Sequence, residues 1–244
     1  MATTVPKPNT NKIQSVEQYG RLYIKQFLQD QITSKDSIYS DWREALNFLF
    51  SKVFYRGRRD ELSERFMWAT LKTLKEIELD SGYDKQLLDN RLQSNGVNNH
   101  KDRKMVCEVL DFVFNLPTPY DHNIVRYTIE RIKSGKILDI FNELNTIYAI
   151  GDKLSSFYIR DVALVFDLEN KLLVDDFKYC QPIDTWVKQV AVKLGIISSQ
   201  EGDIETIKLA IINGCQGANT SPLLFNAGAW MVGAKSFDLL IEQL

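Results

Sequence analysis

The chain has 244 residues, of which 44% are hydrophobic and 25% charged, as in soluble globular proteins with a sizeable core. No segment approaches the ~18 consecutive apolar residues that span a bilayer, so we expect an intracellular, cytoplasmic protein without a membrane partner. The net charge of −2 argues against a protein whose whole surface binds nucleic acid, so any DNA binding must use a local positive face.

The cysteines and histidines predict no metal site. Cys107, Cys180 and Cys215 are widely spaced and form no C-x-x-C pair of the kind that holds zinc or an iron–sulfur cluster, so we expect reduced and mostly buried thiols. His100 and His122 are too few for a metal site or a Ser/His triad. Metal-dependent and triad hydrolases are therefore disfavoured.

The first predicted element is a flexible tail at residues 1–14. This segment contains two prolines and no apolar run, so we do not expect it to pack. From residue 15 onward apolar residues recur with a period near 3.6, and sustained alternation is almost absent, so the predicted fold class is all-α. The longest predicted non-helical connection is 167–183. The predicted helices lie at 15–32, 40–54, 60–79, 84–92, 102–115, 120–133, 136–147, 152–166, 184–195, 203–213, 221–232 and 235–243.

Residues 137–165 are expected to form a helix, a tight turn and a second helix. Ile147, Ile150 and Gly151 make the predicted turn, and Asp152 begins the second helix. Gly151 can adopt a backbone conformation that is closed to other residues. The N–H groups at the start of the next helix can hold a DNA phosphate without a basic side chain. This helix-hairpin-helix would let an acidic protein bind DNA.

Two motifs give the chain a specific resemblance. I-x-x-I-G-x-K-x-x-S begins at Ile147, P-I-D-T-x-V-x-x-V begins at Pro182, and together they resemble the signature of the helix-hairpin-helix (HhH-GPD) DNA glycosylases. The resemblance is greatest to the bifunctional 8-oxoguanine DNA glycosylase/AP lyase branch with archaeal-type spacing. It implies that 15–244 form one glycosylase domain of two helical lobes, with the active site in the cleft between them.

Carried over onto this sequence, the family's lysine nucleophile matches Lys153 and its aspartate matches Asp184. The segment 223–230 resembles the helix that follows in the family, where small residues let it pack beside the catalytic lobe. The chain departs from the pattern at Ala149, where the hairpin usually has a glycine. It also lacks an obvious segment to wedge the strands apart, so the residue that fills the gap left by a flipped base is not identified.

The two candidate catalytic residues each have a structural alternative. A cation at a helix N-terminus is disfavoured by the helix dipole, which should lower the pKa of Lys153 and enrich its neutral amine. The alternative is a solvated lysine on a hairpin. Asp184 precedes a helix and can be an ordinary N-cap, or can cap the helix and also stabilise a cationic sugar.

The other candidate residues belong to a base pocket and to a DNA-binding surface. An everted base would stack on aromatic rings, with core packing as the alternative, and the candidates are Phe157, Trp186 and Trp230. A phosphate would be bound by serines of the second hairpin helix or by a basic loop after Tyr55, with a solvated loop as the alternative. These candidates are Gly151, Ser155, Ser156, Arg56, Arg58 and Arg59, followed by the weaker group Lys101, Arg103 and Lys104.

The resemblance implies excision of an oxidised purine, with 8-oxoguanine as the leading lesion, from double-stranded DNA. Lys153 would attack C1′ and form a Schiff base, after which elimination cleaves the strand. No metal or organic cofactor is required, and we expect a nucleoid-associated monomer. Two alternatives stay open: a non-catalytic helix-hairpin-helix DNA-binding protein, and a monofunctional glycosylase for another damaged base in which Lys153 contacts a phosphate.

Overall fold

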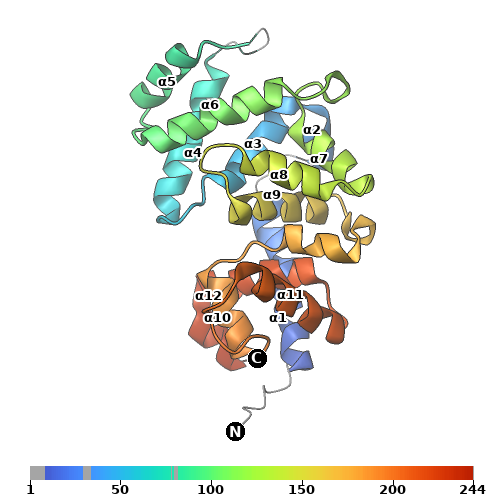
Figure 1. Cartoon of the computed structure of the whole chain (residues 1–244). Coiled ribbons are helices and arrows are strands. Elements are labelled where there is room, and N and C mark those ends of the chain that lie inside the picture. The colour runs from blue at the N-terminus through green and yellow to red at the C-terminus, as the bar shows by residue number, and fades with distance from the viewer. Residues whose placement is uncertain (1–8, 30–33, 78, 80–81, 244) are drawn as a thin grey trace. The chain divides into compact units, whose positions relative to one another are not determined.

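The computed structural model describes residues 9–29, 34–77, 79 and 82–243, with the backbone alone for 235–243. Every element of these residues is helical, which confirms the predicted all-α class (Figure 1). The chain divides into two compact units. Gln31–Tyr158 form the continuous unit, and Met1–Asp30 with Ile159–Leu244 form the split unit.

The continuous unit is built from amphipathic helices, and the first turns of several of them are capped by polar side chains. Asp41, Asp84, Asn99 and Asn123 each accept a backbone N–H of the helix that follows. The helices bury apolar faces against one another. They are α2 (Lys35–Ser40), α3 (Trp42–Val53), α4 (Asp60–Lys75), α5 (Lys85–Ser94), α6 (His100–Phe114), the 3₁₀ turn η3 (Thr118–Tyr120), α7 (Ile124–Lys133), α8 (Ile137–Asn145) and the first half of α9 (Asp152–Val165).

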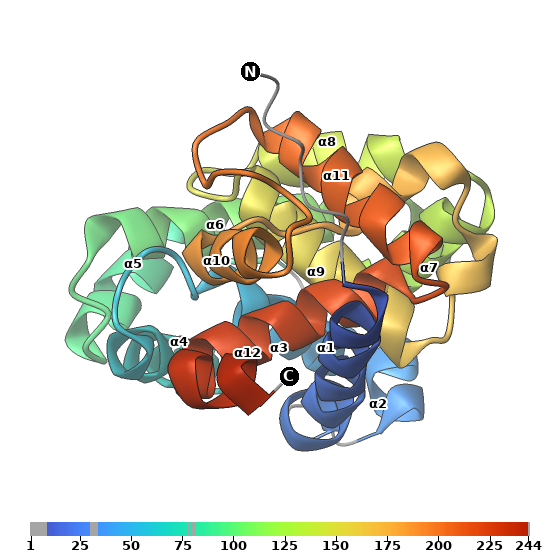
Figure 2. The ribbon, with the colours of Figure 1, turned by 90° about the horizontal axis from the view of Figure 1, so that it is seen from below.

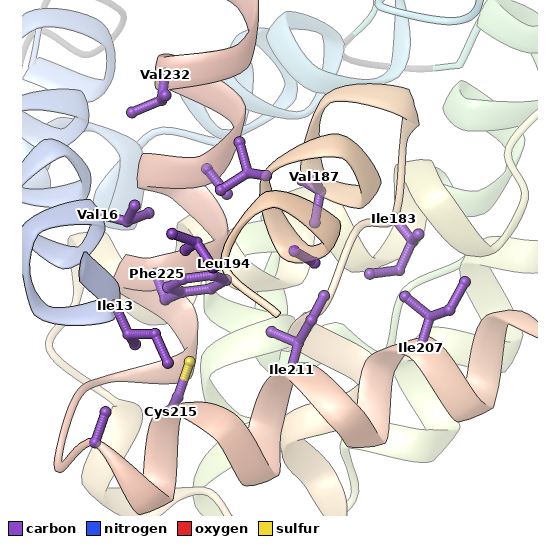
Figure 3. Packing of buried hydrophobic residues seen from close by; sticks show 14 residues of the cluster. Ile13, Val16, Ile183, Val187, Leu194, Ile207, Ile211, Cys215, Phe225 and Val232 are labelled. Carbon is purple, nitrogen blue, oxygen red and sulfur yellow. The ribbon is translucent and has the colours of Figure 1, made fainter. Parts of the chain in front are cut away.

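The split unit joins the two ends of the chain around a second core. Its elements are α1 (Thr10–Tyr23), the π-helical turn η1 (Ile24–Leu28), the end of α9, the 3₁₀ helices η4 (Glu169–Lys171) and η5 (Val174–Cys180), α10 (Thr185–Lys193), α11 (Ile204–Gly217) and α12 (Pro222–Gln243). In Figure 3 apolar side chains of α1, α10, α11 and α12 converge around Phe225, which is fully buried. This core holds the start of α10 in place.

Helix α12 packs against α1 so closely that the two backbones approach each other (Figure 2). A Cβ atom on Gly228 would lie 2.0 Å from the Val16 carbonyl oxygen, and one on Gly20 would lie 2.0 Å from the Leu224 carbonyl oxygen. The small residues of 223–230 therefore serve a close helix crossing, and the partner helix is α1.

The predicted tail is wrong for residues 10–14. Asn9 caps α1 by accepting the Lys12 N–H at 3.2 Å, and Ile13 is buried in the core of the split unit. The cap and the apolar face both begin before residue 15, so the helix does too. Residues 1–8 of the predicted tail lie outside the described residues, as do residues 30–32 of the first predicted helix.

Three other predicted boundaries need correction. The segment 40–54 contains the end of α2 and all of α3, because Asp41 leaves the helical conformation and caps α3. The predicted loop 167–183 contains η4 and η5. The last two predicted helices are one helix, since Gly233 packs against Trp186 inside α12 instead of ending the helix.

Candidate active site

The hairpin between α8 and α9 has its left-handed residue at Ala149, with φ 64°. The prediction that Gly151 takes a conformation closed to other residues is wrong, because Gly151 has no positive φ and a Cβ there would meet nothing within 4 Å. Ala149, where the family pattern usually has a glycine, is thus the residue of the turn with a strained, left-handed backbone. Gly151 leaves open space in front of the first turn of α9.

Helix α6 fastens the hairpin turn through two side chains. Glu108 Oε2 accepts the Tyr148 N–H at 2.5 Å, and the Lys104 ammonium lies 4.2 Å from the centre of the Tyr148 ring. Lys104 and Glu108 are themselves 3.8 Å apart. Nothing in the sequence pairs α6 with the hairpin, so the role of Glu108 could not be predicted, and Lys104 was expected among the weaker DNA-contact candidates.

Lys153 lies in the first turn of α9 and is half-buried. Its Nζ donates to the Tyr55 carbonyl oxygen at 3.4 Å, and among the described residues it has no ion pair with a carboxylate. The Tyr55 hydroxyl donates to Glu64 Oε1 at 3.1 Å, and burial raises the Tyr55 pKa, so this hydroxyl stays neutral. The partner of the Lys153 amine is thus a backbone carbonyl oxygen, which carries no net charge.

The start of α9 differs from the prediction in its serines. Ser155 and Ser156 are fully buried, so neither hydroxyl can reach a phosphate, and their assignment as DNA-binding residues is wrong. Ser155 Oγ donates to Asn145 Oδ1 at 3.3 Å, while Ser156 Oγ has no hydrogen-bond partner among the described residues. Both serines lie on the buried side of α9, next to the buried Leu154, and therefore face the interior.

Asp184 belongs to the split unit and is the N-cap of α10. Its Oδ1 accepts the Val187 N–H at 2.9 Å, and its backbone is extended, as an N-cap requires. The carboxylate is half-buried, and Oδ2 accepts no hydrogen bond among the described residues. The capping role that the sequence allowed is thus present, with one carboxylate oxygen left for another partner.

A buried polar network inside the split unit was missed by the sequence analysis. Arg160 binds Asp161 Oδ1 through Nε at 2.9 Å and Nη2 at 2.7 Å, and donates from Nη1 to Asn226 Oδ1 at 2.8 Å. Tyr23 donates to Asp161 Oδ2 at 2.7 Å. The adjacent charges at 160 and 161 lie within a run of buried apolar residues, and this pattern could have indicated a paired interior site.

The three aromatic pocket candidates have different surroundings. Phe157 is half-buried, with the Lys52 ammonium 5.6 Å from its ring centre. Trp230 packs edge-to-face on Tyr23 and Phe27 at 5.8 and 5.2 Å, which is the core packing that the sequence left open. Trp186 is 39% exposed on the first turn of α10, and its Cβ side supports Gly233.

The basic loop is mostly tied to the buried carboxylate of Asp102. Arg58 binds both Asp102 oxygens, at 2.6 and 3.1 Å, and Arg56 binds Oδ1 at 2.6 Å. These two arginines are structural in this arrangement rather than free for DNA, and Arg59 is the exposed member of the loop. Arg103 is likewise buried and pairs with Asp89 at 2.8 Å.

The split unit also contains a pocket of about 380 Å³. Glu169 in the wall of this pocket accepts a hydrogen bond from the Ser221 hydroxyl at 2.7 Å. Burial raises the Glu169 pKa, the negative charge of Glu17 raises it further, and the hydrogen bond from Ser221 acts in the opposite direction. Arg21 pairs with Glu17 at 2.9 Å. The lining residues are Glu17, Arg21, Ile24, Ala163, Leu164, Asp167, Glu169, Asn170, Ser221 and Leu224.

Within the described part of the chain, no three His, Cys, Asp or Glu side chains converge as a metal site would need. The three cysteines form no disulfide; Cys180 and Cys215 are buried, and burial raises the Cys215 pKa to about 12. None of the described helices combines the length and apolar character that a bilayer crossing requires.

No protein-family model matches the chain, and no solved structure matches it. The chain is similar to an uncharacterized protein of Methanocaldococcus jannaschii, with 31% identity over 88 residues. The match covers 36% of this chain and 20% of that protein, so the chain spans about one fifth of the relative's length. Since the relative is itself uncharacterized, this similarity brings no activity to the chain.

Proposed function

We propose that the chain is a helix-hairpin-helix DNA glycosylase with AP lyase activity, which removes an oxidised purine, 8-oxoguanine in the first instance, from duplex DNA. The observation that carries the proposal is Lys153. Its amine lies directly after the hairpin turn, half-buried, and is held by a carbonyl oxygen rather than by a carboxylate. Such an amine can attack carbon without first leaving an ion pair with a carboxylate.

In the proposed reaction the Lys153 amine attacks C1′ of the damaged nucleotide and the bond from C1′ to the base breaks. The base leaves with the electron pair and takes up a proton. Opening of the sugar gives a Schiff base, loss of a C2′ proton breaks the bond to the 3′ phosphate, and hydrolysis frees the lysine. Asp184 would stabilise the cationic sugar through its charge. The capping bond uses Oδ1 alone, so Oδ2 remains for this role.

DNA would be held by the open hairpin. Gly151 has no side chain with which to cap α9 and no Cβ to keep a phosphate away. Within the described residues the Lys153 amide has no backbone acceptor, so it can donate to a phosphate at the positive end of the helix dipole. The Asp152 carboxylate in the same turn opposes this attraction, so we expect moderate affinity.

Trapping with borohydride tests the proposal, because reduction converts a Schiff base into a stable covalent complex. The wild-type protein is incubated with duplexes that carry 8-oxoguanine opposite each base, an abasic site or no damage. We expect covalent complexes with the lesion and abasic duplexes alone. Lys153→Gln should abolish them, and Lys136→Gln, which changes an exposed lysine at the start of α8, should not. Trapping by Lys153→Gln would show that another amine carries the chemistry.

The non-catalytic alternative is favoured by one observation, the capping bond of Asp184, which explains this carboxylate without any reaction. In that case the wild-type protein would bind duplex DNA and give no trapped complex with any duplex. A monofunctional glycosylase would release the base and leave the abasic strand intact. Analysis of base and strand products from the same reactions separates the three functions.

A further inference from the structure

The loop that leads to Asp184 is fastened to α12 by two buried amide side chains. Gln181 Nε2 donates to the Pro222 carbonyl at 3.3 Å, and Asn226 Nδ2 donates to the Pro182 carbonyl at 3.2 Å. Gln181 and Asn226 are both fully buried. Proline has no N–H, so the carbonyl is the only backbone hydrogen-bonding group through which Pro182 can be held.

The orientation of the Asn226 amide is set by Arg160. A guanidinium has donors only, so the group that faces Arg160 Nη1 must be the oxygen, Oδ1, at 2.8 Å. The Nδ2 donor is then directed to Pro182. If the amide were rotated by 180°, its Nδ2 donor would face the Arg160 donor and its Oδ1 acceptor would face the Pro182 carbonyl. Both contacts would be unfavourable in the buried interior, so the amide has one orientation.

Arg160 is itself fixed by the next residue of α9 and by a hydroxyl of α1. Asp161 binds its Nε and Nη2, and the Tyr23 hydroxyl of α1 accepts from Nη2 at 3.1 Å while donating to Asp161. Arg160, Asp161 and Tyr23 are all at most 2% exposed. Buried ion pairs are weak contributors to stability compared with apolar packing, so their main physical effect here is a defined direction for each hydrogen bond.

We infer that Asn226 is a positioning residue for Asp184. Arg160 orients the Asn226 amide, the amide holds Pro182, and the fixed φ of proline passes this constraint through buried Ile183 to the carboxylate two residues later. The hydrogen bond from Val187 sets the other side of the same carboxylate. That the position matters for base release rests on the proposed function.

The variant that isolates the inference is Asn226→Asp. It keeps the size of the side chain and an oxygen for Arg160, but replaces the donor that faces Pro182 by a second acceptor. The matched control is Tyr23→Phe, which removes one hydroxyl from the far end of the same network and leaves the bond from Asn226 to Pro182. Asn226→Ala serves as a second variant if Asn226→Asp does not fold.

Hydrogen exchange of backbone amides gives the readout that needs no activity. We expect Asn226→Asp to speed exchange of the Val187 amide about tenfold or more, since this amide is protected by Asp184, with other helices unchanged. Tyr23→Phe should leave the Val187 amide protected. Unchanged protection in a folded Asn226 variant would overturn the inference.

Single-turnover kinetics give the second readout. Base release by Asn226→Asp should slow about 10²-fold, with duplex affinity unchanged and Schiff-base trapping on a preformed abasic duplex retained, because a displaced carboxylate fails only in the first step. In an Asp184→Asn background the Asn226 change should cost nothing further.

If the two substitutions slow base release additively in the double variant, Asn226 acts independently of Asp184. Asn226 would then be a general structural residue, and its positioning role would be overturned. If the wild-type protein releases no base, the proposed function fails, and the exchange of the Val187 amide alone decides whether Asn226 positions Asp184.

Discussion

Asp102 shows how a buried carboxylate changes the meaning of the charged residues around it. Three arginines within four residues resemble a phosphate-binding loop when only the sequence is considered. In the fold, Arg56 and Arg58 neutralise Asp102, whose side chain is fully buried. Two arginines of the loop are therefore needed to neutralise Asp102 in the fold, and Arg59 is exposed to solvent.

The first prediction concerns Arg58→Ala. This change removes the bidentate partner of Asp102 and leaves a buried carboxylate with Arg56 alone, so the free energy of unfolding should fall by about 3 kcal/mol. Arg59→Ala is the matched control and should change it by less than about 0.5 kcal/mol. Urea unfolding of the three proteins checks this, and equal stabilities would mean that Asp102 does not depend on Arg58.

At the same scale, the sequence predicted residue types better than residue partners. Lys153 and Asp184 fall at helix starts as their motifs imply. Ser155 and Ser156 also fall at a helix start, but their direction depends on which face of α9 is buried. Asn226 and Glu108 could not be assigned, because their partners are distant in the chain and no local pattern specifies them.

The proposed DNA binding depends on the hairpin, and the strained residue of the hairpin gives the second prediction. Ala149 has φ 64°, a conformation that costs an L-residue roughly 1 kcal/mol or more and glycine almost nothing. Ala149→Gly should raise the free energy of unfolding by about 0.5 to 1 kcal/mol. Ala163→Gly, inside α9, should lower it. A loss of stability in Ala149→Gly would contradict the left-handed turn.

Gly151→Ala is the third prediction and separates folding from binding. The added methyl group meets no atom within 4 Å and needs no positive φ, so thermal stability should be unchanged. The methyl group would stand where a phosphate approaches the first turn of α9, so duplex affinity should fall by roughly 1 kcal/mol, the value of one good contact. Gly217→Ala, also in open space, is the control; equal affinities would remove the hairpin from the DNA contacts.

The crossing of α1 and α12 gives the fourth prediction. In Gly228→Ala the new Cβ would lie 2.0 Å from the Val16 carbonyl oxygen, which is backbone and cannot turn aside. The two helices would have to separate, so the free energy of unfolding should fall by about 3 kcal/mol. Calorimetry or urea unfolding against Gly217→Ala checks the difference, and a fully stable Gly228→Ala would contradict the crossing.

The elements themselves were largely predictable, since the period of apolar residues is a local property. Their ends were less so. Asn9 and Asp41 each cap a helix by accepting a backbone N–H. Whether such a residue caps a helix, continues one or lies in coil depends on packing that the local sequence pattern does not contain. Gly233 looks like a helix breaker in sequence, yet it is the close contact of α12 with Trp186.

For the whole molecule, the balance of charge bears on how the proposed DNA substrate would be held. The net charge is −2, and the structure ties Arg56, Arg58, Arg103 and Arg160 to carboxylates. These four guanidinium groups are therefore not free to displace counterions from DNA, and the 32 Asp and Glu residues of the chain offset the charge of its other Lys and Arg residues. The proposed hairpin contact would use backbone amides, whose binding of phosphate releases fewer ions than binding by lysine or arginine.

The fifth prediction follows from that balance. Duplex affinity, measured by fluorescence anisotropy between about 50 and 200 mM salt, should fall with a log–log slope of about −2 to −3, as for two or three neutralised phosphates. Arg59→Ala should make the slope shallower by about 1, since it deletes the exposed cation of the basic loop. Arg91→Ala, which removes an exposed arginine from the last turn of α5, should leave the slope unchanged. A wild-type slope as steep as about −6 would mean that many side-chain cations bind the backbone, and the amide-based hairpin contact would then be a minor part of DNA binding.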